Sequence, residues 1–378
     1  MKILYYYSKL KIGGAERSTI RLMNELANDG HQVTLLLRWN GDLESELNSD
    51  IKCIYLKKTM PIFERFGKIG ALMNQAIGMI SLSYKKYFLL KRDKYDLAIN
   101  GLLGYNPSIL FEHIQANCYM QMLRNDVSVT RSYGETEHYM NEFGKRFNAY
   151  IGVSKYVTDS FKTCYPQLAE RAYTIYNILP NIDASVTQEC PEIYCKDKTI
   201  LRILTVCRLE EKSKGLLRMA RIAQCLQKEF PGKFKWYVVG SGQDRLLLQN
   251  KIEEYGLENT MILCGATSDP LPYYAHSDLV AVLSYYEGLC GVVNEAKLMC
   301  KPVIATQFSG IDEQIQNGIN GIIVENEEKS ILEKMQQILW APDSIKRYEF
   351  NGMPEKLLDN KGKVKDLVNL YKKITCNC

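Results

Sequence analysis

The sequence predicts an α/β fold of two doubly wound domains that face each other across a cleft. Short apolar segments of strand type alternate with helical patterns along nearly all of the 378 residues, and this alternation is typical of parallel sheets covered by helices. The alternation breaks at 177–198, where Pro180, Pro191 and several acidic residues interrupt it, and then resumes. The length suits two or three domains, since one domain usually holds about 100–200 residues.

The first half is predicted to form one domain over 1–180. It opens with a buried strand at Ile3–Tyr7 and a helix at about Glu16–Asp29, which Gly30 is well placed to end. The further strands are predicted at Val33–Leu37, Ile51–Leu56, Leu97–Asn100, Cys118–Leu123 and Tyr150–Val153.

The second half is predicted to form a similar domain over 181–345. Its strands are predicted at Ile200–Val206, Lys235–Val239, Met261–Leu263, Leu279–Leu283 and Val303–Thr306. Its helices are predicted at Gly215–Phe230, Gln243–Tyr255 and Gly291–Met299. The last part, 346–378, is predicted to form helices that pack back on the body.

Composition excludes several classes of protein. The first 180 residues hold 23 Lys and Arg against 17 Asp and Glu, and this excess predicts an anionic partner such as a phosphate, a lipid headgroup or an acidic glycan. No basic run is interleaved with aromatic residues, so no nucleic-acid partner is expected. The 12 cysteines and 4 histidines form no zinc pattern. No signal peptide or run of about 18 apolar residues is found, which predicts a cytoplasmic protein.

The most specific motif runs from Glu287 to Glu295, between a predicted strand and a predicted helix. Its glycines let the backbone approach a ligand closely, and the N–H groups at the helix start can bind a diphosphate. The two carboxylates can accept hydrogen bonds from sugar hydroxyls. On spacing alone, a helix cap and a surface carboxylate would explain the two glutamates equally well. The predicted ligand-binding backbone comprises Gly288, Leu289, Cys290 and Gly291.

Three further motifs follow predicted strands. Arg208 and Lys214 could neutralise a nucleotide diphosphate, although an exposed basic turn is the alternative explanation. Gly240 and Gly242 suit a close backbone approach, and an ordinary strand-to-helix turn explains them as well. The pair Gly13-Gly14 precedes the first helix, but it lacks the full dinucleotide-binding spacing.

Together these motifs resemble the GT-B glycosyltransferases, specifically the family-4 type of retaining enzymes (glycosyl transferases group 1), which consist of two Rossmann-like domains. The resemblance covers nearly the whole chain. The matching segments are Gly13–Arg17, Asn24–Val33, Ile151–Lys155, Ile175–Asn177, Cys207–Leu209, Lys214-Gly215, Val239–Gly242, Asp278-Leu279, Ser284–Leu289, Glu295-Ala296 and Lys301–Thr306.

The resemblance implies a role for each matching position. Glu287 would bind hydroxyls of the donor sugar, and Glu295 would hold the nucleotide ribose. Arg208 and Lys214 would stabilise the leaving diphosphate, over which Gly13-Gly14 would close. Attack would occur on the same face that the diphosphate leaves, and the leaving phosphate would help to deprotonate the acceptor. The nucleotide sugar would be the donor substrate, with no cofactor and no metal, because no Asp-x-Asp motif occurs.

The sequence also departs from the family pattern. Related enzymes often carry a histidine in a first-domain loop near the acceptor, and here Arg124 occupies the comparable place, with Asp126 after it. His113 lies nearby on a helical pattern, where packing is the competing explanation. The spacing of Arg208 and its lysine partner is one residue longer than usual. Lys214 is preferred over Lys212 because it precedes glycine. The candidates on the acceptor side are therefore Arg124, Asp126 and His113.

The segment Met60–Lys94 has a basic amphipathic pattern. It predicts either peripheral contact with the inner face of the cytoplasmic membrane or a core helix with solvated lysines. The acceptor would then be a glycan or a lipid-linked saccharide. The enzyme would act in the assembly of a bacterial surface polysaccharide. Two alternatives stay open: a non-catalytic protein that binds a nucleotide sugar, and a nucleotide-sugar epimerase of the same fold.

Overall fold

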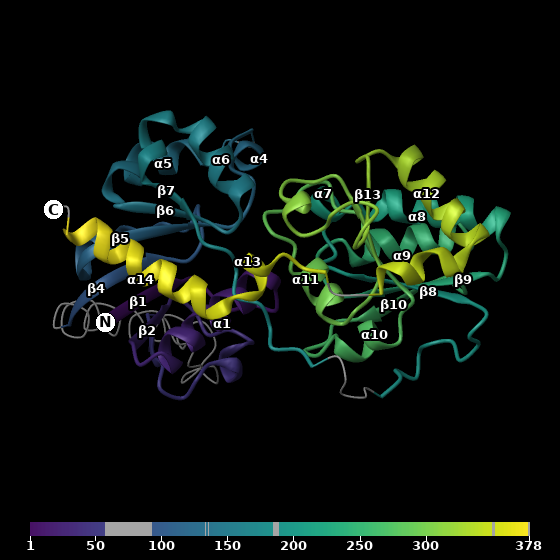
Figure 1. The fold of residues 1–378 in the computed structure, drawn as a ribbon, viewed down its shortest axis with the longest axis horizontal. Helices are drawn as coiled ribbons and strands as arrows, with labels where there is room; N and C mark the ends of the chain where they lie inside the picture. The colour runs from purple at the N-terminus through teal and green to yellow at the C-terminus, as the bar shows by residue number, and fades with distance from the viewer. Residues whose placement is uncertain (57–92, 133, 135, 184–188, 350–351, 377–378) are drawn as a thin grey trace, which may run out of the picture. The chain divides into compact units, whose positions relative to one another are not determined.

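The chain folds into two compact units. The computed structural model describes residues 1–56, 93–132, 134, 136–183, 189–349 and 352–376. Unit 1 consists of Met1–Ile178 together with Asp359–Cys378, and unit 2 consists of Leu179–Leu358. Each unit has one parallel sheet with helices on it (Figure 1). The predicted α/β fold, with a doubly wound sheet in each half, is confirmed.

The sheet of unit 1 has the order β3-β2-β1-β4-β5-β6-β7, and all neighbours are parallel. β1 is an interior strand of this sheet because its apolar residues can be buried on both faces, and Ile3 pairs with Val33 on one side and Leu97 on the other. The strands are β1 (Lys2–Tyr7), β2 (Gln32–Leu37), β3 (Lys52–Tyr55), β4 (Lys94–Asn100), β5 (Gln115–Leu123), β6 (Ala149–Gly152) and β7 (Ala172–Thr174).

Helices connect these strands. The helices of unit 1 are α1 (Gly14–Asn28), α3 (Ser108–His113), α4 (Val127–Ser132), α5 (Glu137–Phe143), α6 (Lys155–Cys164) and α14 (Asn360–Cys376). The last of them returns from the far end of the sequence and packs on α1 and β5 (Figure 1). Its buried residues Val364, Leu367 and Leu370 explain this packing. The Nζ of the buried Lys363 also donates to the carbonyl of Asn177 at 2.9 Å.

The sheet of unit 2 has the order β10-β9-β8-β11-β12-β13, again with all neighbours parallel. Its strands are β8 (Leu201–Val206), β9 (Phe234–Val239), β10 (Met261–Gly265), β11 (Leu279–Val282), β12 (Val303–Thr306) and β13 (Ile322–Val324). Its helices are α7 (Glu211–Lys214), α8 (Leu216–Glu229), α9 (Arg245–Glu254), α10 (Leu271–Ala275), α11 (Gly291–Leu298), α12 (Glu328–Trp340) and α13 (Glu355–Leu358).

Alternate residues of the central strands of unit 2 face two separate apolar layers. Ile203 packs in the layer that contains α8, α9 and α12, whereas the next residue, Leu204, packs in the layer that contains α10 and α11. This alternation is the period of two that a strand imposes on its side chains. The sheet is therefore buried on both faces, as expected of a parallel sheet.

The structure differs from the sequence predictions in several elements, and one predicted segment lies outside the described residues. The strands β7 and β13 and the helix α12 were not predicted. The predicted third part is divided between the units, since residues up to Leu358 belong to unit 2. The basic segment Met60–Lys94 lies outside the described residues except for its last two, of which Lys94 begins β4. In the described part of the chain, no helix combines the length and apolar character that crossing a membrane requires.

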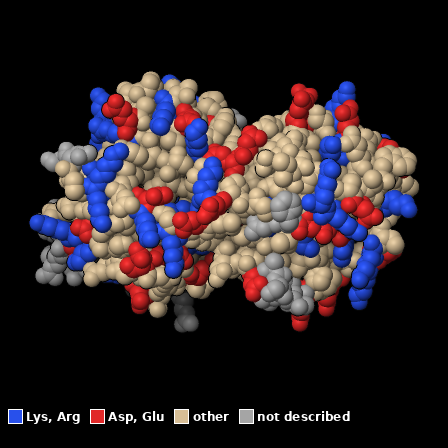
Figure 2. All heavy atoms as spheres, viewed as in Figure 1, with Lys and Arg blue, Asp and Glu red and all other residues tan. Residues whose placement is uncertain are grey.

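Charges are mixed on the molecular surface. Figure 2 shows Lys and Arg interspersed with Asp and Glu on the visible face of both units. The excess of positive charge in the first half is therefore not gathered into one patch on this face.

Candidate active site

Unit 2 has a switch point in its sheet between β8 and β11. β8 pairs with β9 on one side and with β11 on the other, so the chain proceeds from β8 toward one edge and later from β11 toward the other. The loops after these two strands diverge, and ligands of open parallel α/β sheets bind at this position. Arg208 and Lys214 follow β8, and Glu287 follows β11.

An ion pair joins the two loops. Lys214 is the last residue of α7, and its Nζ donates to Oε1 of Glu287. The hydroxyl of Ser284 donates to the same carboxylate oxygen at 2.7 Å. The side chains of Lys214 and Glu287 are 21% and 15% exposed, so the pair is shielded but remains in contact with solvent. The structure thus brings together a cation and a carboxylate that lie 73 residues apart in the sequence.

The conformation of Gly215 places Lys214 in this position. Gly215 has φ +64°, a left-handed conformation that ends α7 after one turn. A Cβ here would lie 2.7 Å from Nε of Arg218 and 3.1 Å from the carbonyl oxygen of Leu283. Only glycine therefore fits between α7 and the end of β11. The alternative cation Lys212 is exposed on the same turn.

The electrostatics of the site favour a charged lysine. Burial lowers the pKa of Lys214, but the negative charge of Glu287 and its hydrogen bond to the ammonium act together in the opposite direction, and the pKa lies above its usual range. Burial raises the pKa of Cys207 and that of Cys290 to about 12. Both thiols stay protonated near neutral pH, and protonated thiols are poor nucleophiles. The site therefore contains an ammonium, a carboxylate and neutral thiols.

A buried arginine that the sequence analysis did not single out supports the loop of Glu287. Arg218 in α8 is 2% exposed, its Nε donates to the carbonyl of Leu283 at 3.1 Å, and its Nη1 donates to Oδ1 of Asn326 at 2.7 Å. Its guanidinium also lies 4.1 Å from the ring centroid of Tyr285. Arg218 therefore holds the segment that leads from β11 to Glu287. The signal in the sequence is an arginine within the apolar pattern of a helix.

A buried glutamine fixes the start of α11. The N–H of Cys290 donates to Oε1 of Gln314 at 3.0 Å, and Nε2 of Gln314 donates back to the carbonyl of Cys290 at 2.8 Å. The same Nε2 donates to Oδ1 of Asn294 at 2.7 Å. A Cβ at Gly291 would meet no atom within 4 Å, so the first turn of α11 borders open space. Of the other predicted backbone positions, Gly288 and Leu289 are buried.

Glu295 lies one turn further along α11 and is half-buried. The hydroxyl of Tyr274 donates to its Oε2 at 3.1 Å. Tyr274 was not among the site residues predicted from the sequence.

The loops after β8 and β9 pack directly against each other. A Cβ at Gly240 would overlap the carbonyl oxygen of Cys207, and one at Gly242 would overlap that of Leu209. Backbone packing therefore requires both glycines, and it fixes the turn that carries Arg208. Arg208 itself is exposed, and within the described residues its side chain makes no hydrogen bond or ion pair. This cation can therefore turn toward an anionic ligand.

Gly13 and Gly14 stand at the start of α1 in unit 1. Gly13 is the N-cap residue and has an extended backbone. Gly14 is exposed, and a Cβ there would meet no atom within 4 Å. Neither close packing nor a positive φ explains why position 14 is glycine.

Arg124 is an internal link of unit 1. It is 6% exposed, and its Nε donates to the carbonyl of Gly101 at 3.0 Å. Its Nη2 donates to Thr19 at 2.6 Å and to the hydroxyl of Tyr5 at 3.3 Å, and its Nη1 donates to Asn177 at 3.3 Å. The guanidinium thus ties β1, α1 and the loop after β4 to the end of the first half.

Asp126 and His113 also have local partners. Oδ1 of Asp126 accepts the N–H of Ser128 at 2.9 Å and the hydroxyl of Ser160 at 2.6 Å, which is how an aspartate caps the start of a helix such as α4. His113 is the last residue of α3, and its Nε2 lies 3.7 Å from Oε2 of Glu112.

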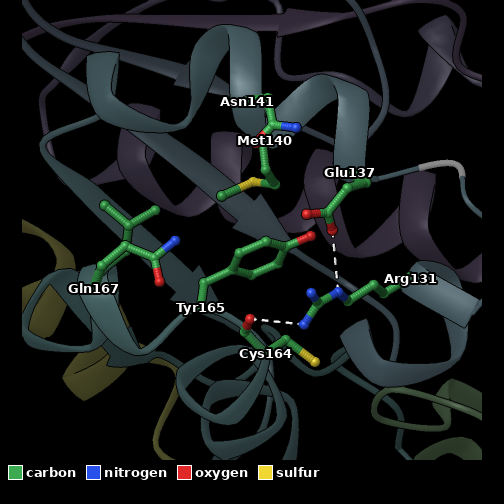
Figure 3. A pocket seen from close by; sticks show the side chains of 8 residues that line it. Arg131, Glu137, Met140, Asn141, Cys164, Tyr165 and Gln167 are labelled. Carbon is green, nitrogen blue, oxygen red and sulfur yellow. Dashed lines mark hydrogen bonds and ion pairs between the residues drawn. The ribbon is translucent and has the colours of Figure 1, made fainter.

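A surface pocket of about 160 Å³ lies elsewhere in unit 1 (Figure 3). Arg131 crosses it, since its Nε donates to Glu137 at 3.0 Å and its Nη1 donates to the carbonyl of Cys164 at 2.9 Å. These contacts hold α4, α5 and α6 together and account for the polar lining. The lining residues are Arg131, Glu137, Met140, Asn141, Cys164, Tyr165, Gln167 and Leu168, and none is a predicted site residue.

The geometry of unit 2 agrees with a match to a known family. Residues 188–352, which include the Lys214–Glu287 pair, match the model of the glycosyl transferases group 1. The chain is a glycosyltransferase of the GT-B fold. In the described residues of this glycosyltransferase, no group of three or more His, Cys, Asp and Glu side chains could hold a metal ion.

Relatives of this glycosyltransferase match most of its length. It is 22% identical to the amylovoran biosynthesis glycosyltransferase AmsD of Erwinia amylovora, over 89% of this chain and 88% of the relative. It is 21% identical, over 95% and 94% of the two chains, to the GalNAc-alpha-(1->4)-GalNAc-alpha-(1->3)-diNAcBac-PP-undecaprenol alpha-1,4-N-acetyl-D-galactosaminyltransferase of Campylobacter jejuni. A solved structure of HepE from Anabaena, in complex with UDP and glucose, has the same fold, with a TM-score of 0.71, 21% identity and 98% of both chains covered.

Proposed function

We propose that this glycosyltransferase moves a sugar from a nucleoside diphosphate sugar to a glycan or lipid-linked acceptor, with retention of configuration and without a metal ion. The observation that carries the proposal is the Lys214–Glu287 pair at the switch point of the unit 2 sheet. A leaving diphosphate is stabilised by cations and N–H donors, and sugar hydroxyls are bound by carboxylates. The loops after β8 and β11 have both kinds of group.

The leaving group is stabilised by side chains in this proposal. The ammonium of Lys214, which Glu287 keeps protonated, and the exposed guanidinium of Arg208 neutralise the charge that develops on the diphosphate. The N–H groups in the first turn of α11 add the partial positive charge of a helix start. When the donor binds, the phosphate replaces Glu287 as the partner of Lys214, and Glu287 becomes free to accept hydrogen bonds from the donor sugar.

The transfer is proposed to occur on one face of the sugar. The bond between the anomeric carbon and the phosphate oxygen breaks, and its electron pair stays on the phosphate. The acceptor oxygen forms the new bond to the anomeric carbon from the same side. The proton of the acceptor hydroxyl passes to an oxygen of the departing phosphate. No side chain is then needed as a strong base, and Glu295 binds the ribose.

The acceptor class is proposed from the relatives. The name of one refers to amylovoran biosynthesis, and the name of the other refers to a PP-undecaprenol-linked saccharide. These names support our proposal that the chain acts in the assembly of a bacterial surface polysaccharide such as capsule, exopolysaccharide or lipopolysaccharide. Membrane contact is one of the two alternatives predicted for the basic segment Met60–Lys94, and such contact would bring the enzyme close to a lipid-linked acceptor.

The test is a thermal-shift panel of UDP-, GDP- and ADP-sugars, with and without EDTA. A ligand of the native state raises the melting temperature by mass action. One nucleotide class should raise it, with or without EDTA, for the wild type and for Lys212→Ala, which removes the neighbouring exposed lysine. Lys214→Ala should weaken the shift and lower kcat by about 10²–10³-fold, the usual loss for one group that stabilises developing charge.

The product distinguishes the remaining parts of the proposal. The anomeric configuration of the product, measured by NMR, should be that of the donor. An inverted product contradicts retention, and a shift or activity that EDTA abolishes contradicts metal independence. If no nucleotide sugar stabilises the wild type, or Lys212→Ala and Lys214→Ala behave alike, the proposed site is wrong.

A further inference from the structure

Tyr274 contacts the second glutamate of the motif from inside unit 2. It lies in α10 and is 0% exposed, and its hydroxyl donates to Oε2 of Glu295 at 3.1 Å. Glu295 lies in α11 and is half-buried. The hydrogen bond therefore connects a fully buried side chain to a carboxylate that reaches the surface, across 21 residues of sequence.

The position of the Tyr274 ring is fixed by packing. The ring belongs to an apolar cluster of unit 2 that includes Val280, Val293 and Ala296. The backbone is fixed as well, because the N–H of Tyr274 donates to the carbonyl of Pro270 at 3.2 Å and its carbonyl accepts the hydroxyl of Ser277 at 2.9 Å. The phenol hydroxyl thus points at Glu295 from a rigid base.

We propose that Tyr274 is a positioning residue that orients the carboxylate of Glu295 toward the hydroxyls of a ribose. This inference rests on the proposed function, in which Glu295 binds the nucleotide ribose. Tyr274 is fully buried, so it touches no ligand and acts only through Glu295. A hydrogen bond from a phenol to a carboxylate is charge-assisted and directional. A carboxylate that is already oriented loses less freedom when a ligand binds.

The proposal predicts that the Tyr274–Glu295 pair gives the site a preference for ribose over deoxyribose. A correctly oriented carboxylate can accept both the 2′- and the 3′-hydroxyl of a ribonucleoside diphosphate. Removal of the Tyr274 hydroxyl deletes one hydrogen bond that orients the Glu295 carboxylate, and the preference for ribose over deoxyribose should shrink. A hydrogen bond that served only packing would affect stability and leave this preference unchanged.

The test measures binding of nucleoside diphosphates to the whole chain by calorimetry. Of UDP, GDP and ADP, the one that the wild type binds tightest is compared with its 2′-deoxy and 3′-deoxy forms. The wild type should bind the ribose form more tightly, and Glu295→Ala should remove the preference. Tyr274→Phe keeps the ring and removes only the hydroxyl, so it should reduce the preference by about three- to tenfold, the size expected for one ordinary intramolecular hydrogen bond.

Tyr194→Phe is the matched control. Tyr194 is 3% exposed, and its hydroxyl donates to the carbonyl of Tyr273 in the same helix α10 at 3.0 Å. This variant loses a buried tyrosine hydroxyl in the same region and should keep the wild-type preference.

The possible outcomes distinguish the positioning role of Tyr274 from the binding of ribose by Glu295. If Tyr274→Phe keeps the full preference, or weakens ribose and deoxyribose forms equally, the positioning role is wrong. If Glu295→Ala keeps the preference, Glu295 does not bind the ribose, and that part of the proposed function is wrong. If the wild type binds none of the three nucleoside diphosphates, both are overturned.

Discussion

Lys214 is the residue on which the proposed chemistry depends most, and in the structure it is held by Glu287. Because Glu287 holds the pKa of Lys214 above its usual range, an incoming diphosphate meets a protonated lysine at neutral pH. When the diphosphate binds, it replaces the carboxylate of Glu287 as the anion beside Lys214. The lysine is therefore never left unpaired in a shielded site, a state that would be unfavourable. The ion pair therefore keeps Lys214 protonated and still allows a diphosphate to replace Glu287 as its partner.

Arg218 gives a prediction about activity at the scale of one side chain. Arg218→Lys keeps the charge but cannot bind Leu283 and Asn326 with one planar group or stack on Tyr285 in the same way. The loop that carries Glu287 should become less well placed, and kcat should fall by about tenfold, since small misplacements at a reacting centre have large effects on rate. Steady-state kinetics with the preferred nucleotide sugar measures this.

The control for Arg218 is on the same helix. Arg221→Lys alters a surface pair with Glu328, in which the arginine is 43% exposed, and surface pairs contribute little. It should leave kcat within about twofold of the wild type. Equal effects of the two substitutions, or an unchanged kcat in Arg218→Lys, would show that the loop does not depend on Arg218.

Some residues of the candidate site could be predicted from the sequence and others could not, and the difference has a physical reason. Glu287 and Lys214 stand in motifs that can be read along the chain. Arg218 and Tyr274 act through contacts with partners 65 and 21 residues away, and only the folded sheet brings these partners together. Arg124 stays a predicted residue of the acceptor side, and the structure adds that its guanidinium is bonded to groups of unit 1.

Close packing between two loops gives a prediction at the scale of secondary-structure elements. Gly240 has φ +146°, and a Cβ there would overlap the carbonyl oxygen of Cys207. Gly240→Ala should therefore lower the free energy of unfolding by about 3 kcal/mol or more, through strain and overlap together. Chemical denaturation followed by circular dichroism measures this.

Gly256→Ala separates strain from overlap. Gly256 also has a positive φ, of +64°, but a Cβ there would meet no atom within 4 Å. It should lower the free energy of unfolding by only about 1 kcal/mol. If Gly240→Ala is no more destabilising than Gly256→Ala, the two loops are able to move apart.

An element could be predicted from the sequence only where its hydrophobic pattern was long enough to recognise. β1 and β8 were predicted because a run of apolar residues buried on both faces is conspicuous. β7 and β13 have three residues each, too few to show a period, and they become strands only because a neighbouring strand pairs with them. Helix ends were less certain: α9 begins at Arg245, two residues after its predicted start.

The division of the whole molecule into units predicts the effect of a truncation. Removal of residues after Leu358 deletes α14 and exposes the surface of α1 and β5 on which it packs. With Val364, Leu367 and Leu370 removed from the core, unit 1 should lose roughly 5 kcal/mol of stability. Hydrogen exchange should become faster in α1 and β5 and stay unchanged in unit 2.

A variant of the exposed face of α14 is the control. Lys361→Ala with Lys365→Ala changes two exposed side chains of the helix and should leave exchange in both units as in the wild type. Faster exchange throughout unit 2 of the truncated chain would contradict the division into units.

The return of α14 to unit 1 has a consequence during protein synthesis. Unit 2 is one continuous stretch, Leu179–Leu358, so all of it is synthesised before α14. Unit 1 must wait for α14, and at about 5–20 residues per second the wait from Ile178 to Cys376 is roughly 10–40 s. For that time the apolar surface that α14 later covers is open on the nascent chain, where chaperones would find it.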